Sequence, residues 1–292
     1  MISEFVPFWA KYWRYIIISL ITYVSVVLLT RRGKNKDSYP CEKSLNNELT
    51  VEDQNHSDNG DLEEPVPALP QFLEHVPYDY VKPDESDVKK KAREFYSIAN
   101  ARRTVRFFSN ENVPKSVIHD LIRSAGTAPS GAHTEPWTFV AISKPDLKQK
   151  IREIIEREEE LNYKKRMGKK WTTDLEPLRT NWIKEYLTVA PWLILVFKQT
   201  HGWLSDGRKK MHYYSEMSVS IACGILITAI QYAGLVTLTS TPLNCGPSLR
   251  QLLGRPSSEK LCLLLPVGYP SNEATVPKLT RKSLDEIMVE YD

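Results

Sequence analysis

Three arginines lie close together in ARRTVRFFS, residues 101–109, directly after a predicted helix. They are Arg102, Arg103 and Arg106. A guanidinium group can give a phosphate two parallel hydrogen bonds, so the cluster is suited to holding a phosphate-bearing ligand. The alternative is a solvated basic surface at a helix C-terminus, where positive charge is favourable in any case.

A second stretch, TAPSGAHTEPW at 127–137, places small residues before an apolar strand. Such loops let backbone N–H groups approach a ligand, although small residues are also common in plain helix-to-strand connections. Ser130 has no histidine and aspartate partners at a recognised spacing, so we do not expect a nucleophile. His133 could donate a proton, but a lone histidine is more often structural. The sequence also lacks the Gly-x-Gly-x-x-Gly and Walker A motifs.

Hydrophobic periodicity and turn residues predict the elements that position these stretches. We expect an α+β fold, an α/β sandwich whose sheet is flanked by helices. The apolar helix at 215–234 contains Ser, Thr and Gln, which favour a core or dimer-interface helix over a second membrane span. The other expected helices run from Ser86 to Ala99, after Pro114 to Gly126 and from Pro145 to near Gly168, and the strands are Trp137–Ile142, Trp192–Phe197, Leu235–Thr239 and Leu261–Val267.

The N-terminal part has a different composition. Residues 12–30 form an apolar stretch of membrane-spanning length, and the basic stretch RRGKNK follows it. The positive-inside rule therefore predicts a single-pass membrane protein with its C-terminal bulk in the cytosol, at the plasma membrane or a vesicle membrane. The expected domains are a membrane anchor at 1–36, an acidic flexible linker at 37–85 and a folded domain at 86–292.

Charge and cysteine content exclude several classes of protein. Residues 41–80 contain ten acidic residues against one lysine, so the rest of the chain is basic. No basic run is interleaved with aromatic residues, so we expect no nucleic-acid partner. The four cysteines form no Cys-x-x-Cys pair, and we expect neither a metal site nor a disulfide framework.

The two opening stretches, as Arg-Arg-x-x-Arg-x-Phe and Ala-Pro-Ser-Gly-x-x-x-x-Pro-Trp, resemble the FMN-dependent nitroreductase superfamily. GLVTLTSTP (234–242), LLGRPSSEKLCLLLPVGYP (252–270) and Arg281 extend the resemblance over about 90–290. It implies a nitroreductase-like mixed sheet flanked by helices and an intertwined homodimer in which two subunits share each flavin site. The FMN-binding residues that it implies are Arg102, Arg103, Thr104, Val105, Arg106, Pro129, Ser130, Gly131, Thr239, Ser240, Thr241 and Arg281.

Four further stretches, SGAHTEPWTFV, EEELNYKKRMG, TNWIKEYL and TPLNCGP, are similar to the branch of this superfamily that reductively removes iodide from mono- and diiodotyrosine. That likeness implies a role in iodide salvage and thyroid hormone metabolism, with electrons ultimately from NADPH, directly or through a reductase. It implies that Glu159 and Lys184 bind the ammonium and carboxylate of the substrate, with Tyr163 beside them. The backbone N–H of Ala132 would hold the phenolate oxygen, and Thr241 would hydrogen-bond N5 of the flavin.

Glu159 and Tyr163 are four residues apart and so share one face of the predicted helix. Taken alone, these residues also fit a solvated charged helix, and the hydroxyls of 239–241 fit simple strand-end caps. The polar stretch 156–180 fits a lid that becomes ordered over a bound substrate. The alternative functions are a general nitro or quinone reductase of the same superfamily and a non-catalytic, membrane-tethered flavin- or ligand-binding protein.

Overall fold

The structure is a computed structural model that describes residue 67 and residues 69–291 of the chain. The predicted membrane span at 12–30, the basic stretch after it and the first part of the predicted linker lie outside the described residues. The chain divides into two units between Leu62 and Glu63, and every described element belongs to the second unit.

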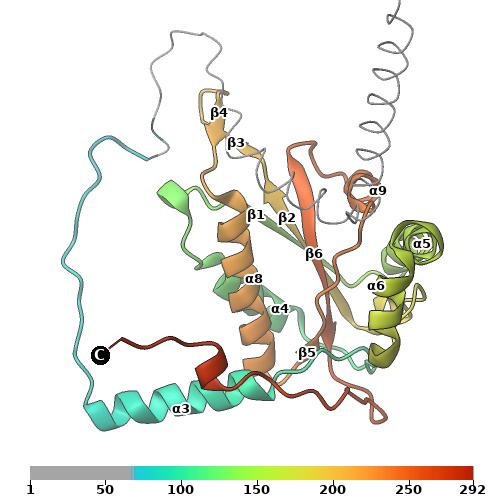
Figure 1. Cartoon of the computed structure of the whole chain (residues 1–292). Helices are drawn as coiled ribbons and strands as arrows, with labels where there is room; N and C mark the ends of the chain where they lie inside the picture. Colours follow the sequence, from blue (N-terminus) through green and yellow to red (C-terminus); the bar gives the residue numbers. More distant parts are fainter. Residues whose placement is uncertain (1–66, 68, 292) are drawn as a thin grey trace, which may run out of the picture. The chain divides into compact units, whose positions relative to one another are not determined.

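The centre of this unit is a four-stranded sheet with the strand order β1-β2-β6-β5 (Figure 1). Neighbouring strands in this order are antiparallel. Thr104 adds a parallel bridge to Thr237, so the sheet is mixed, as predicted. The strands are β1 (Trp137–Ile142), β2 (Trp192–Gln199), β5 (Val236–Thr237) and β6 (Glu259–Gly268).

Two helical layers cover the sheet because β2 is apolar on both faces. Leu193, Leu195 and Phe197 belong to one core cluster, and the alternate residues Ile194 and Val196 belong to the other. The first cluster packs beneath one group of helices and the second beneath another, which confirms the predicted flanked sheet. The first group is α5 (Pro145–Leu161), α7 (Tyr186–Val189) and α9 (Gly246–Leu252), and the second is α4 (Lys115–Gly126) and α8 (Ser215–Tyr232).

The long charged helix ends differently from the prediction. Its α-helical part stops at Leu161, and a π-helical turn, η2 (Asn162–Arg166), follows it. Gly168, with a φ of 72°, then begins the next helix. The extra residue in a π turn lets the Asn162 side chain point inward, where it is buried and donates to Glu159 Oε1 at 3.2 Å. The stretch 156–180, which was predicted to form a lid and which we call the lid region, continues as α6 (Gly168–Leu175) and the short turn η3 (Glu176–Leu178).

The remaining elements are a hairpin and three short or peripheral helices. The hairpin pairs β3 with β4 in antiparallel register. Helix α3 begins one residue earlier than the predicted Ser86, with Asp84 at its N-cap. These elements are β3 (His201–Trp203), β4 (Lys209–Met211), α3 (Glu85–Ala101), η1 (Gly131–His133) and η4 (Leu284–Glu286).

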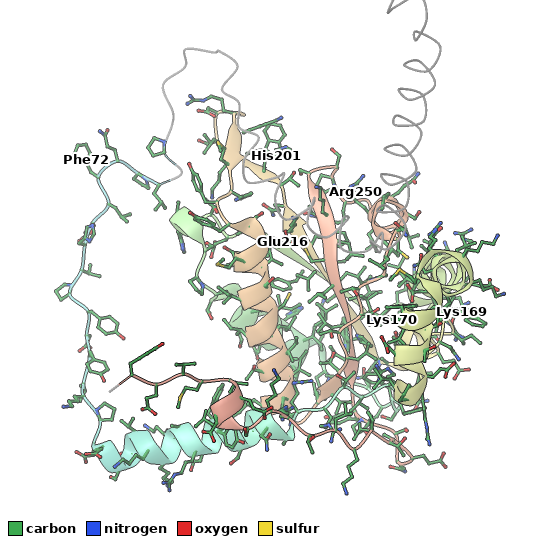
Figure 2. The ribbon with its side chains drawn as sticks, in the orientation of Figure 1. Phe72, Lys169, Lys170, His201, Glu216 and Arg250 are labelled. Atoms are coloured by element: carbon green, nitrogen blue, oxygen red, sulfur yellow. The ribbon has the colours of Figure 1, made fainter. Side chains whose placement is uncertain are left out.

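Several apolar segments lie outside the core. Helix α3 has no buried residue, and residues 70–82 are exposed without helix or strand. Phe72, in this extended segment, is 90% exposed and stands away from the sheet (Figure 2). Near the C-terminus the exposed apolar residues are Leu279, Leu284, Ile287, Met288, Val289 and Tyr291. Among the described residues, both the segment that begins at residue 69 and the C-terminal segment therefore expose apolar side chains.

Helix α8 is the one helix in the described part of the chain that is long and apolar enough to cross a membrane. Its buried face includes Val219, Cys223 and Leu226, which pack in the core cluster shared with α4. Its other face exposes Met217 and Ile221. This arrangement confirms the predicted core position of the helix and leaves an apolar face uncovered.

Candidate active site

The predicted phosphate-binding arginines meet in one cavity of about 680 Å³. Arg102 and Arg103 reach it from the end of α3, and Arg281 comes from the C-terminal segment. Arg281 donates to the carbonyl oxygens of Asn100 (2.7 Å) and Arg102 (2.9 Å), which fixes its position. Thr104 and Arg106 line the same cavity.

This cavity has the electrostatic character that a dianionic phosphate requires. Burial, together with the charges of Arg281 and Arg103, lowers the pKa of Arg102 from its ordinary value. The residues that line the cavity include no acidic residue. Like charges that are held together at the cost of desolvation indicate a site for an anion, and the donor set fits the phosphate group of FMN.

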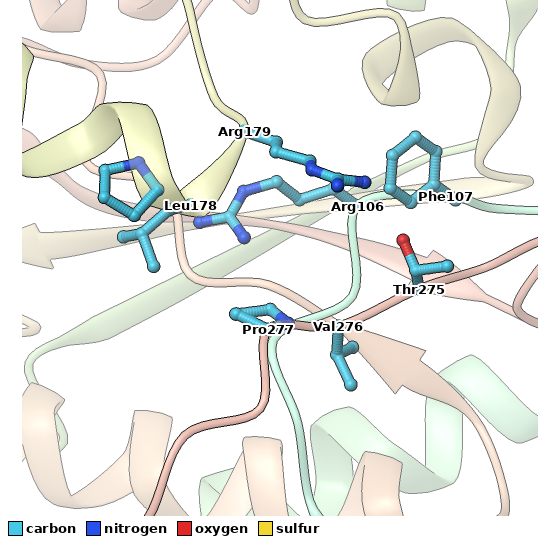
Figure 3. A pocket seen from close by; sticks show the side chains of 8 residues that line it. Arg106, Phe107, Leu178, Arg179, Thr275, Val276 and Pro277 are labelled. Atoms are coloured by element: carbon cyan, nitrogen blue, oxygen red, sulfur yellow. The ribbon is translucent and has the colours of Figure 1, made fainter.

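A smaller cavity of about 350 Å³ lies beside this site, and Arg106, Leu178 and Pro277 line both. Arg106 and Arg179 extend across it from opposite walls, beside Phe107 (Figure 3). Arg179 belongs to the turn after η3 and has a left-handed φ of 50°. The end of the lid region therefore lies directly against the arginine cavity.

The predicted substrate clamp is also assembled. Lys184 Nζ lies 3.7 Å from Glu159 Oε2, and the two side chains are 8% and 12% exposed. Burial lowers the pKa of Lys184, and the nearby Glu159 carboxylate opposes that shift. A buried pair of opposite charges is costly to desolvate and gives only weak support for stability.

Tyr163 forms an aromatic wall beside this ion pair. Its ring lies 5.5 Å from Lys184 Nζ and packs edge-on against Trp171 (4.6 Å) and Trp182 (5.9 Å). Burial raises the pKa of Tyr163, while a hydrogen bond with Thr180 opposes the shift. The lid region thus contributes an aromatic enclosure, although its ordering by substrate stays a prediction.

Arg106 and Tyr186 connect the clamp to the residues predicted around the flavin. The charge of Arg106 acts on Tyr163, Lys184 and Tyr186. Burial raises the pKa of Tyr186 to about 12, and its phenol forms a hydrogen bond with Ser240. The arginine cavity, Ser240 and the clamp therefore belong to one region, which we call the clamp side.

Other predicted flavin residues have mixed environments. Thr239 and Thr241 are exposed, whereas Ser240 exchanges backbone hydrogen bonds with Leu264 at 2.8 and 2.9 Å. Val105 is buried, and its N–H donates to the Thr237 carbonyl, so its backbone extends the sheet. The hydroxyls of 239 and 241 are accordingly free of the core and available to a ligand.

The turn at 129–135 is built from strained backbone. Ala132, His133 and Glu135 all have φ near 50°, a left-handed conformation that costs roughly 1–2 kcal/mol for each non-glycine residue. Ser130 Oγ accepts from the Glu135 N–H at 3.0 Å. A Cβ on Gly131 would lie 2.8 Å from the Tyr213 carbonyl oxygen, so this glycine is required by the protein's own packing.

The turn does not join the clamp side within one chain. Figure 1 shows η1 as the light-green turn beyond α8, whereas α5 and α6 lie on the opposite side of the sheet. The contacts that brace the turn come from the region after β3, through Tyr213 and the Lys210 ammonium, which lies 3.5 Å from the Thr134 carbonyl. One chain thus carries the predicted site residues as two separated groups.

Sequence reasoning missed the residues that support the clamp. Glu156 accepts a hydrogen bond from the Lys184 N–H at 2.6 Å, and Tyr186 connects to Ser240. Trp171 and Trp182 enclose Tyr163. Aromatic residues at 163, 171 and 182 within an otherwise charged segment were the available signal, because such residues are seldom left in solvent.

Comparisons with known proteins show the family of this chain. A family model for the nitroreductase family matches residues 99–269. Iodotyrosine deiodinase 1 of Homo sapiens is 66% identical over 217 residues, covering 74% of this chain and 75% of that protein. Its Mus musculus counterpart is 64% identical over 219 residues, covering 75% and 77%. A crystal structure of oxidised iodotyrosine deiodinase bound to FMN and 3-iodo-L-tyrosine gives a TM-score of 0.59 at 32% identity, covering 68% of this chain and 98% of that chain.

Proposed function

The chain belongs to the nitroreductase family, and from its similarity to iodotyrosine deiodinases we propose that it uses FMN to remove iodide reductively from mono- and diiodotyrosine. The observation that best supports this proposal is the buried Glu159–Lys184 pair at 3.7 Å, with Tyr163 beside it. An amino acid carries an ammonium and a carboxylate on one carbon atom, and this pair offers a partner to each. A general nitro or quinone reductase has no use for such a pair.

Arg102, Arg103 and Arg281 would hold the FMN phosphate in the arginine cavity. Bound FMN supplies the two electrons that the reaction needs, and these come ultimately from NADPH, directly or through a reductase. The residues proposed to lie along the flavin ring are Thr104, Val105, Arg106, Pro129, Ser130, Gly131, Thr239, Ser240 and Thr241, with Thr241 donating a hydrogen bond to N5.

In binding the amino acid end of the substrate, Glu159 and Lys184 would exchange their contact with each other for contacts with the substrate. Glu159 accepts from the ammonium group, Lys184 donates to the carboxylate, and the Tyr163 ring covers the bound molecule. Because both charges are already desolvated in the structure, binding does not add the full cost of burying them. The lid region at 156–180 would then exclude water.

The phenol end would be held by the turn. The Ala132 N–H donates to the phenolate oxygen, which favours the ionised form of the phenol. Overall, a carbon–iodine bond is replaced by a carbon–hydrogen bond, with two electrons and one proton consumed and iodide released. Ala132 therefore acts through its backbone, and its left-handed conformation sets the direction of that N–H.

We also propose a homodimer in which each site combines the clamp side of one chain with the turn of the other. The separation of these groups within one chain supports this arrangement, as do the uncovered apolar residues at both ends and on α8. The membrane anchor at 12–30, with the catalytic domain in the cytosol, completes the proposal. Light scattering of the purified domain should give twice the monomer mass.

Steady-state turnover by the purified FMN-loaded domain tests the function. With dithionite as the reductant, we expect iodide and tyrosine from diiodotyrosine, with a higher kcat/KM than for a nitroaromatic compound. A preference for the nitroaromatic would favour a general reductase. Binding of diiodotyrosine without iodide release would favour a non-catalytic binding protein.

A further inference from the structure

Three charged side chains on one face of α5 connect this helix to the segment that carries Lys184. They are spaced four residues apart, at 148, 152 and 156, so they lie one above another along the helix. Lys148 Nζ donates to the carbonyl oxygens of Thr188 (3.1 Å) and Ala190 (2.7 Å). The first connection thus holds the end of α7 against α5.

Arg152 makes the second connection. Its Nε donates to Glu156 Oε1 at 2.7 Å, and one terminal nitrogen donates to Thr188 Oγ1 at 3.0 Å. The two side chains of this ion pair are 23% and 25% exposed, so water screens the pair only partly. Arg152 therefore orients the Glu156 carboxylate and ties it to α7.

Glu156 makes the third connection, at the substrate clamp itself. The same oxygen, Oε1, that accepts from Arg152 also accepts from the Lys184 backbone N–H at 2.6 Å. Lys184 then reaches Glu159, one turn further along α5, with its ammonium group. Both the main chain and the ammonium group of Lys184 therefore contact α5. Their partners, Glu156 and Glu159, are three residues apart on that helix.

We propose that Glu156, oriented by Arg152, is a positioning residue that sets where Lys184 presents its ammonium group to the carboxylate of an amino acid substrate. This proposal rests on the proposed function, because it assigns Lys184 to the substrate carboxylate. Glu156 itself touches neither substrate nor flavin. Its loss should weaken recognition of the carboxylate and leave the iodophenol end unaffected.

The test uses the FMN-loaded full-length protein and two ligands, 3-iodotyrosine and 3-iodotyramine, which lacks the carboxylate. Affinity is measured by quenching of flavin fluorescence. In Glu156→Ala the Lys184 N–H loses a charged acceptor, which should weaken iodotyrosine binding about tenfold or more. Iodotyramine binding should change less than about twofold, since it makes no carboxylate contact.

Glu156→Gln is the conservative variant, because its amide oxygen can still accept from the Lys184 N–H. It should recover most of the lost iodotyrosine affinity. If the alanine variant folds poorly, Arg152→Gln removes the partner that orients Glu156 and should likewise weaken binding of iodotyrosine more than binding of iodotyramine. The matched control is Glu153→Ala, on the same helix but outside the lid region, which removes an exposed hydrogen bond with Gln149 and should leave both affinities unchanged.

Three outcomes separate the possibilities. The proposal is supported if Glu156→Ala and Lys184→Gln both remove the preference for iodotyrosine over iodotyramine. It is overturned if Lys184→Gln removes that preference but Glu156→Ala keeps it, or if Glu156→Ala weakens both ligands equally. If Lys184→Gln itself keeps the preference, the assignment of Lys184 to the carboxylate fails, and with it the proposed clamp.

Discussion

The clamp side and the turn at 129–135 prepare their ligand contacts in opposite ways. On the clamp side, charged side chains are buried and held by partners within the chain, as at Glu159 and Lys184. In the turn, the contact proposed is a backbone N–H, set by left-handed residues in an exposed loop. In the proposed function, the clamp side would provide charge recognition and the turn would fix a direction. Within one chain the two groups lie on opposite sides of the sheet (Figure 1), and the proposed dimer would join them into one site.

The largest effect should come from removing the phosphate-binding charges of the clamp side. Replacing Arg102 and Arg281 together by Gln should weaken FMN binding at least about 100-fold, since each charged hydrogen bond contributes roughly 1.5–3 kcal/mol. The purified variant should be nearly colourless, and flavin titration measures the loss. The control is Arg123→Gln, which removes only an exposed pair with Asp120. If the variant kept the flavin content of the wild type, the assignment of the arginine cavity to the FMN phosphate would be contradicted.

A mixed dimer tests whether the two groups belong to different chains. Glu159→Gln should disable the clamp. Ala132→Pro should disable the turn, because proline has no N–H and cannot adopt a φ near 50°. In a heterodimer of these two variants, purified through two different tags, one of the two sites is intact. We expect about half of the wild-type activity per dimer, from the symmetry of a two-chain site.

If each site lay within one chain, both sites of that heterodimer would be disabled and no activity would return. Each homodimeric variant should itself be at least about 100-fold less active than the wild type. Thermal denaturation of each variant checks that lost activity reflects the site rather than unfolding.

A smaller effect is expected in the pH dependence of substrate binding. Burial lowers the pKa of Lys184, so its ammonium is lost, and iodotyrosine affinity falls, at a lower pH than for an ordinary lysine. In Lys184→Arg the guanidinium stays charged, and the alkaline loss should move to higher pH. The substrate's own amine titrates alike with both proteins, so the difference reports Lys184. If iodotyrosine affinity fell at the same alkaline pH in the wild type and in Lys184→Arg, a role for the charge of Lys184 would be contradicted.

The same shift predicts the sign of a stability effect. Between the lowered pKa in the folded protein and the ordinary value in the unfolded chain, the unfolded state binds more protons. Stability contributed by this position should therefore rise with pH across that window. Denaturant unfolding of the wild type and of Lys184→Gln should show this rise in the wild type only.

The smallest effects should come from neighbouring substitutions in the turn. Gly131→Ala places a methyl group 2.8 Å from the Tyr213 carbonyl oxygen and should destabilise the domain by about 1–3 kcal/mol. Ala132→Gly keeps the N–H, relieves the left-handed conformation and should change stability by less than about 1 kcal/mol. Its kcat/KM should stay near that of the wild type. Equal destabilisation by both would contradict the role given to Tyr213.

The sequence predicted most of the sheet and several flanking helices because these carry strong periodic patterns. It did not predict the β3–β4 hairpin or the helices α6, α7 and α9, and β5 is shorter than the predicted Leu235–Thr239. β1 has the predicted bounds, and β2 and β6 extend their predicted cores by a few residues. Motifs and family resemblance also selected arginines that line one cavity and a Glu159–Lys184 pair that lies close together, while the binding roles of these residues stay predictions. The break at Leu161 was missed, since a π turn depends on the tertiary contacts of Asn162 rather than on local pattern.

Other features could not be predicted because they arise between distant segments. The role of Gly131 depends on Tyr213, 82 positions later, so the flavin was expected to explain a glycine that the protein's own backbone requires. Likewise, nothing in the local sequence shows that the turn and the clamp lie on opposite sides of the sheet. Long-range placement of this kind is a property of the packed sheet.

The most direct test is a single turnover without oxygen. The FMN-loaded domain is reduced by one equivalent of dithionite and mixed with diiodotyrosine, and flavin absorbance and free iodide are measured together. We expect the oxidised flavin spectrum to return as iodide is released, in a ratio of about one iodide per flavin, because each substitution of iodine by hydrogen consumes two electrons. A flavin that stays reduced, or that reoxidises without iodide, would contradict the account.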